Sequence, residues 1–135
     1  MANGGSGMII KPVKLLIATI GLGLGSAAIA ENLVYYGEVR PGSIFLYDSE
    51  TIRKIGDTVT VWTKRDASKD RSVRFRTAMQ KIRIDCSDET LGSLSYTEYG
   101  ADGSIMVSES TSYPEMSPII PGSVGYSLFQ EVCAN

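Results

Sequence analysis

Two cysteines constrain the fold of this chain more than any other feature. Cys86 and Cys133 are the only cysteines among its 135 residues, and both follow an N-terminal segment typical of exported chains. An even number of cysteines in an exported chain favours a disulfide bond. Closing a loop of about 47 residues would stabilise the fold by roughly 4 kcal/mol on the chain-entropy model. The alternatives are free thiols or a redox or metal pair, but the chain has no Cys-x-x-Cys motif and no histidine to complete a metal site.

The N-terminal segment predicts export. Residues 1–7 are small, polar and rich in glycine, like a flexible leader or tag. Residues 8–30 have the three parts of a signal peptide, which are two lysines, an apolar run and a small-residue cleavage site at Ala28–Ala30. A retained membrane anchor is the alternative, but the apolar run is shorter than the ~20 residues that span a bilayer. We therefore expect a mature chain that begins near Glu31 and forms a single domain over residues 31–135.

The absence of histidine argues against catalysis. The chain has 13 Lys and Arg, 15 Asp and Glu, and no histidine. Histidine is the commonest general base near neutral pH, the usual imidazole ligand of zinc and a member of every Ser-His or Cys-His nucleophilic arrangement. We therefore expect no enzyme, no cofactor and no metal site.

The mature chain shows the pattern of an antiparallel sheet. Thr58–Lys64 alternates apolar and polar residues with period two, and the other segments combine β-branched or aromatic residues with flanking turn residues. The apolar positions change parity after Phe75, which predicts a bulge or a break near Ala78–Gln80. The fold class is α+β and mainly β, with about six strands. The expected strands are Leu33–Val39, Ser43–Tyr47, Ile52–Ile55, Thr58–Lys64, the segments Val73–Phe75 and Ile82–Ile84, Leu91–Tyr99 and Ser104–Val107.

The C-terminal segment predicts a helix. Tyr113–Pro121 contains three prolines and reads as an extended connector, because proline cannot occupy a central strand. Ser123 then stands at an N-cap position, and apolar residues recur every four positions from Val124 to Val132. A helix of about ten residues is marginal alone, so we expect it to pack across one sheet face. Cys133 in its last turn would join it to the strand that ends at Cys86.

Several motifs of the mature chain resemble one known family. They are Tyr47–Arg53, Val59–Lys64, Ile84–Cys86 and Ile120–Ser123 followed by Leu128 and Val132-Cys133. Together, and in this order, they resemble the surface-adhesin protein E family over almost all of the mature chain. The resemblance implies an exported bacterial envelope protein with an antiparallel sheet, a C-terminal helix and a disulfide between them. The family's naming members are adhesins that bind host matrix proteins.

This chain departs from that family pattern at two points, and the second bears on location. Tyr35 or Tyr36 stands where the family pattern would place a tryptophan in the first strand. No cysteine follows the signal segment to accept a lipid. We therefore expect a periplasmic or secreted protein as well as a cell-surface one, with membrane contact only through residues 8–30 if they are not cleaved.

The positive charge of the mature domain is concentrated in one stretch. Between Lys64 and Arg83 lie eight cations and two acids, a net charge of +6, whereas the rest of residues 31–135 carries −10. A clustered field of this kind attracts polyanions or an acidic protein surface. The alternative is that these cations occupy ordinary solvent-facing strand positions, which would produce the same run of charge without a partner. Nucleic acid is not expected as a partner, because no aromatic residues alternate with the cations to stack on bases.

Trp62, the only tryptophan, completes the predicted contact surface. Alternation places it on the sheet face opposite Val59 and Val61, so either the sheet is covered on both faces, for example by the terminal helix, or the ring is partly exposed as a binding or dimer anchor. We expect an exported, non-enzymatic, adhesin-like binding module of the bacterial envelope that contacts a protein or a polyanion. The alternative is a structural subunit of an envelope assembly or homo-oligomer with its N-terminal hydrophobic helix retained. The predicted partner-binding residues are Trp62, Arg65, Lys69, Arg71, Arg74, Arg76, Lys81 and Arg83.

Overall fold

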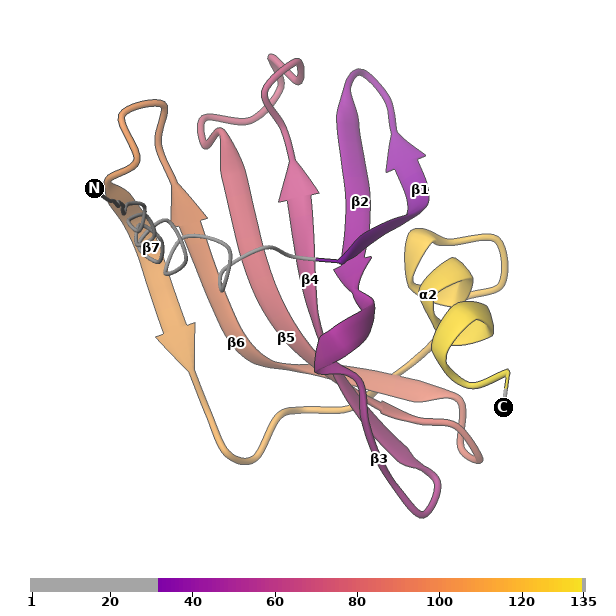
Figure 1. The fold of residues 1–135 in the computed structure, drawn as a ribbon. Helices are drawn as coiled ribbons and strands as arrows, with labels where there is room; N and C mark the ends of the chain where they lie inside the picture. The colour runs from indigo at the N-terminus through magenta and orange to yellow at the C-terminus, as the bar shows by residue number, and fades with distance from the viewer. Residues whose placement is uncertain (1–31, 135) are drawn as a thin grey trace, which may run out of the picture. The chain divides into compact units, whose positions relative to one another are not determined.

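The computed structural model describes residues 32–134, which form one curled antiparallel sheet and a C-terminal helix (Figure 1). The predicted leader and signal peptide, residues 1–30, lie outside the described residues. The main path of the sheet runs β1-β2-β4-β5-β6-β7, with β3 paired to β4 and β8 paired to β6. Its strands are β1 Leu33–Val39, β2 Ser43–Asp48, β3 Arg53–Ile55, β4 Thr58–Asp66, β5 Thr77–Asp85, β6 Thr90–Tyr99, β7 Ile105–Ser110 and β8 Ser117–Pro118. The predicted fold class, a mainly antiparallel α+β protein, is confirmed.

Turn residues set the strand pairing. Gly56 adopts a φ of +60° in the two-residue turn between β3 and β4, a conformation that a side chain would strain. Gly103 also has a positive φ, of +83°, in the longer turn between β6 and β7. The short 3-10 helix η2, Ser49–Thr51, connects β2 to β3, and the Asp48 carboxylate accepts a hydrogen bond from the Glu50 backbone N–H at 3.0 Å.

The predicted strand at Val73–Phe75 is wrong. Residues 67–76 form a loop between β4 and β5, and β5 runs without interruption from Thr77 to Asp85. The predicted break near Ala78–Gln80 is therefore also wrong. The irregularity lies on the neighbouring strand, where Lys81 pairs with Ser95 but Ile82 pairs with Ser93. One extra residue in β6 lets the sheet curl there without disturbing β5.

The core lies on one face of the sheet, which we call the inner face. Val59 and Val61 on β4 and Ile82 and Ile84 on β5 alternate toward this face and are buried. Helix α2, Val124–Val132, packs on it through Leu128 and Val132, both of which belong to the same buried cluster. Figure 1 shows α2 beside β1, and the two are in contact. The opposite side of the sheet, the outer face, carries the other half of each strand's residues.

The end of the chain forms as the sequence predicts. The Ser123 hydroxyl accepts a hydrogen bond from the Tyr126 backbone N–H at 3.1 Å, which satisfies one of the free donors in the first turn of α2. Cys133 follows α2 and is bonded to Cys86 directly after β5, with the two Cα atoms 5.7 Å apart. The predicted helix and its disulfide to the sheet are confirmed. Within residues 32–134 no helix is both long enough and apolar enough to cross a membrane.

Candidate binding surface

The loop of residues 67–76, which we call the basic loop, is folded onto the inner face at one end of the sheet. Ala67 and Phe75 are buried there with Ala78, and Tyr96 packs against them. The Ala67 N–H donates to the Arg76 carbonyl at 2.9 Å, which closes the base of the loop. The alternation of Val73 and Phe75 with arginines therefore reflects a loop anchored by one aromatic side chain, and not a strand.

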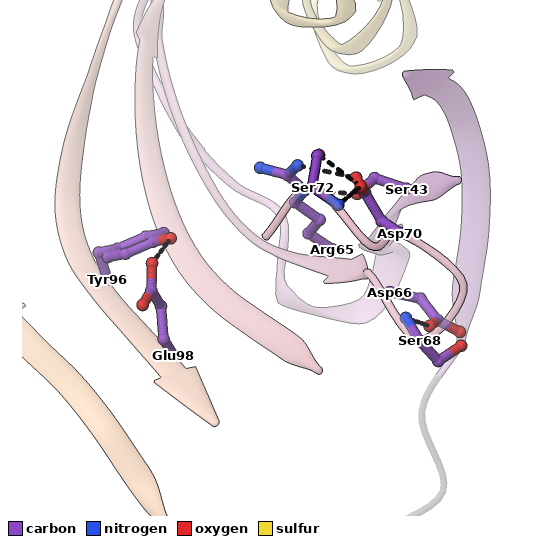
Figure 2. Close-up of polar contacts among 8 residues, drawn as sticks. All are labelled: Ser43, Arg65, Asp66, Ser68, Asp70, Ser72, Tyr96 and Glu98. Atoms are coloured by element: carbon purple, nitrogen blue, oxygen red, sulfur yellow. Dashed lines mark hydrogen bonds and ion pairs between the residues drawn. The ribbon is translucent and has the colours of Figure 1, made fainter. Parts of the chain in front are cut away.

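Asp70 ties the tip of the basic loop to β2. Its carboxylate accepts hydrogen bonds from the Ser43 and Ser72 hydroxyls, each at 2.5 Å, and from the Ser72 backbone N–H at 2.9 Å (Figure 2). The Asp70 side chain is only 1% exposed. These donors, Ser43 first, hold the pKa of Asp70 at about 2, below its ordinary 3.8. The carboxylate is therefore an ionised structural anchor.

Arg65 belongs to this anchor and not to a free surface. Its guanidinium lies over the rings of Phe45 and Phe75, 5.4 and 5.1 Å from their centroids. It also donates to the Ser43 hydroxyl at 2.9 Å and pairs with Asp70 at 3.4 Å. Arg65 shares its parity on β4 with Val59 and Val61, so strand alternation already placed it on the inner face. Of the predicted contact residues, Arg65 is the one that the structure engages internally.

The pKa of Asp70 makes the stability of the basic loop depend on pH. Because the folded-state pKa lies below the ordinary value, Asp70 stabilises the fold above pH 3.8, and this contribution is lost as the pH falls toward 2. We expect Asp70→Asn to lower the melting temperature at neutral pH and to flatten its decline between pH 4 and pH 2, which thermal melts at a series of pH values would measure. A variant that melts in parallel with the wild type across that range would contradict this assignment.

The other cations of the basic loop are free at the surface. Lys69, Arg71, Arg74 and Arg76 are all exposed. Within residues 32–134 the single ion pair is that of Arg65 with Asp70, so no carboxylate in this part of the chain pairs with the four cations. The basic loop therefore presents four exposed cations that form no ion pair within residues 32–134, on a backbone that is fixed by Phe75 and Asp70.

Lys81 and Arg83 lie on a different surface, the outer face of the sheet. In the pairing of β4 with β5, Lys81 is opposite Trp62 and Arg83 is opposite Thr60. Trp62 is half-buried there. Helix α2 packs on the inner face, so of the two alternatives for Trp62, cover by the terminal helix is wrong. The basic stretch of the sequence thus divides between the basic loop and the outer face.

Arg53 joins the outer-face group and was missed by the sequence analysis. It pairs with Thr60 from the other side, because β3 and β4 form a hairpin around Gly56-Asp57. Counting back from that turn would have found it, since a two-residue turn fixes the register of both strands. A shallow pocket of about 210 Å³ lies here, lined by Thr51, Arg53, Thr60, Trp62 and Lys81.

The strongly shifted ionisable groups do not resemble catalytic groups. Burial raises the pKa of Tyr36 to about 12, and burial together with a 2.6 Å hydrogen bond to Glu98 raises the pKa of Tyr96 to about 12 (Figure 2). Asp70 is shifted in the opposite direction. All three shifts lead away from neutral pH, where a general acid or base works best. Residues 32–134 contain no group of three or more acidic or cysteine side chains placed to hold a metal ion.

Comparison with known proteins identifies the family. No curated protein matches this sequence. Among solved structures, crystal form II of Haemophilus influenzae protein E superposes with a TM-score of 0.51 at 18% identity, covering 78% of this chain and 97% of that chain. Another structure of Haemophilus influenzae protein E gives a TM-score of 0.48 at 18% identity, covering 76% and 94%. The first likeness shows a shared fold, and the family model of surface-adhesin protein E matches residues 34–134. The chain therefore belongs to the surface-adhesin protein E family.

Proposed function

We propose that this protein is an exported, non-enzymatic binding module of the bacterial cell envelope that contacts a protein or a polyanion through its cations. Membership of a family of surface adhesins supports the adhesin-like part of this proposal. The single observation that carries the contact surface is the set of exposed cations on the basic loop, which have no carboxylate partner within residues 32–134. Outside Lys64–Arg83, residues 31–135 carry a net charge of −10, so these cations form a distinct local field.

The anchoring of the basic loop supports a role in recognition. A loop that is fixed before it meets its partner loses less conformational entropy on binding than a mobile one. Phe75 and Asp70 hold this loop in place, and neither side chain needs to move for the four cations to be reached. The contact surface of the proposal therefore comprises Lys69, Arg71, Arg74 and Arg76, with Trp62, Lys81 and Arg83 on the outer face.

The proposed location of this protein is outside the cytoplasm. The signal-like residues 8–30 and the small-residue site before Glu31 favour a cleaved, exported chain whose domain is residues 31–135. The Cys86–Cys133 disulfide favours an oxidising compartment, since cytosolic thiols are kept reduced. A periplasmic, secreted or cell-surface protein fits both observations. The absence of histidine and the pKa shifts of Tyr36, Tyr96 and Asp70 favour a protein without catalytic activity.

Reversing two charges of the basic loop tests the contact surface. We expect Arg74→Glu with Arg76→Glu to weaken binding of polyglutamate and of long-chain polyphosphate by at least about tenfold at low salt, because exposed charges attract more strongly when screening is weak. Wild-type binding should also fall steeply with added salt. Fluorescence anisotropy of labelled polymers, measured from low to physiological salt, gives both quantities.

A matched control separates a site from net charge. Lys54→Glu with Ser112→Glu and Gln130→Glu changes the total charge equally, and all three residues are exposed and lie outside Lys64–Arg83. This control variant should bind within about threefold of the wild type, as expected for charges remote from a contact. Equal losses of affinity in the two variants, or wild-type affinity that does not change with salt concentration, would contradict the assignment of the contact surface to the basic loop.

The alternative function, a subunit of an envelope assembly or homo-oligomer, has one observation in its favour. The edge strand β7 is exposed along its whole length and includes Ile105, Met106 and Val107. An open strand edge with apolar side chains can pair with another chain. Sedimentation that shows a single monomeric species at every concentration would rule out self-association.

A further inference from the structure

The outer face carries a compact group of residues that we call the Trp62 patch, formed by Arg53, Thr60, Trp62, Lys81 and Arg83. Thr60 and Trp62 lie on β4, with Arg53 on one neighbouring strand and Lys81 and Arg83 on the other. Paired strands are about 4.8 Å apart. The backbone of each of the three cations is therefore about one strand spacing from β4, on one side or the other of Thr60 and Trp62. The patch is therefore one site from three strands and not a chance run in the sequence.

The three cations of the Trp62 patch form no ion pair within residues 32–134, and the guanidinium of Arg53 is held by hydrogen bonds. Arg53 donates through one guanidinium nitrogen to the carbonyls of Glu50 and Ile52, at 3.1 and 2.9 Å. These bonds hold the guanidinium in place while its other N–H groups stay available. Like charges gathered on both sides of β4 repel one another, and an anionic ligand would relieve this repulsion.

The size of the pocket indicates the size of the ligand unit. At about 210 Å³, the pocket is smaller than the roughly 300–1,000 Å³ of sites that enclose a whole small molecule. Its floor is fixed, because the Trp62 backbone N–H donates to the Thr51 hydroxyl at 3.0 Å. An open pocket of this size suits one unit of a polymer, with neighbouring units lying along the sheet toward Arg83 and Lys64.

The side chains of the Trp62 patch match the chemistry of an acidic sugar. A pyranose ring has an apolar C–H face that packs against an indole, and its carboxylate or sulfate groups pair with arginine and lysine. A polyanion without sugar rings would use the cations but not Trp62. A single-stranded nucleic acid stacks successive bases on several aromatic side chains, and Trp62 is the only aromatic residue that lines this pocket.

We propose that the Trp62 patch binds one acidic sugar unit of an anionic polysaccharide, an inference that rests on the proposed polyanion-binding function and names its ligand class. Trp62 provides the platform for the ring, and Arg53, Lys81 and Arg83 pair with the anionic groups. The basic loop is a separate surface that attracts the polymer by charge alone. The two surfaces therefore differ in what they require of the ligand.

Tryptophan fluorescence tests this assignment directly, because Trp62 is the only tryptophan in the chain. A heparin hexasaccharide should shift the emission to shorter wavelength and protect it from acrylamide. Polyphosphate of similar charge should bind without either change. Equal fluorescence changes with both probes, or binding of the hexasaccharide without any change, would overturn the proposal.

Matched variants locate the same contact. Lys81→Gln with Arg83→Gln should weaken hexasaccharide binding about tenfold, whereas Lys69→Gln with Arg71→Gln, which removes equal charge from the basic loop, should weaken it about twofold.

Trp62→Leu should weaken binding of the hexasaccharide about tenfold and binding of polyphosphate less than twofold, and Trp62→Phe should retain most of the affinity for the sugar. Thermal melting checks that each variant is folded.

The outcomes distinguish this inference from the proposed function. If polyphosphate binds through the basic loop while the Trp62 variants leave hexasaccharide binding unchanged, the sugar site is wrong and the polyanion-binding function stands. If neither probe binds and polyglutamate also fails to bind, the polyanion-binding part of the proposed function falls and the sugar site falls with it.

Discussion

Replacing Cys86 and Cys133 together by alanine should lower the free energy of unfolding by about 4 kcal/mol. The bond joins residues 47 apart in sequence, and the chain-entropy model gives roughly this value for a loop of that length. A domain of this size has only about 5–15 kcal/mol of total stability, so the loss is a large part of it. The disulfide also joins α2 to the end of β5, and α2 contributes Leu128 and Val132 to the buried core.

Urea denaturation of the double variant and of the wild type measures this difference. Reduced wild-type protein is the matched control, since it loses the bond but keeps both side chains, and it should fall close to the double variant. A loss below about 1 kcal/mol in both would show that packing of α2 holds the sheet without the bond.

Leu128→Ala should destabilise the protein by about 3–5 kcal/mol, the range for truncating a fully buried leucine in a core that cannot collapse around the cavity. Leu128 has no exposed surface and belongs to the same cluster as Val59, Val61 and Ile84. It is the central contact of α2 with the inner face. Denaturant unfolding with unchanged slope would give the difference in free energy.

The same helix offers a control for Leu128→Ala. Gln130 is exposed on α2, so Gln130→Ala changes the helix without opening a cavity and should stay within about 0.5 kcal/mol of the wild type. Similar losses in both variants would mean that helix propensity, and not burial of Leu128, controls the stability of this region.

The sequence predicts the parts of the fold that local patterns encode. Alternation in Thr58–Lys64 marks β4, the serine before a four-residue apolar repeat marks the start of α2, and two cysteines in an exported-type chain mark the disulfide. Each of these signals depends on residues close in sequence or on a pair with no competing partner. The confirmed elements are therefore those that strand period, capping and cysteine pairing determine.

The parts that were missed depend on contacts between distant segments. A four-residue alternation at Val73–Arg76 cannot distinguish a strand from a loop whose phenylalanine fills the end of the core. The hydrogen bond from Ser43 to Asp70 joins residues 27 apart, and no local pattern predicts it. Arg65 and Arg53 are different cases, since the parity of β4 and the register of the hairpin around Gly56 would have placed them.

Charge counted along a chain is consequently a poor guide to charge on a surface. Once the chain is folded, the eight cations between Lys64 and Arg83 form an exposed group on the basic loop, a half-buried group on the outer face and one internal ion pair. The basic loop and the outer face derive from the same stretch of sequence but present different chemistry. The outer face places an aromatic ring, Trp62, in one pocket with Arg53 and Lys81, whereas Phe75 of the basic loop is buried.

Amide chemical-shift mapping tests most directly whether these cations are the contact surface. Titration of ¹⁵N-labelled protein with polyphosphate should move the amide signals of the basic loop most, with smaller changes at Lys81 and Arg83. Shifts concentrated on α2 or β7, or no shifts at low salt, would contradict the claim.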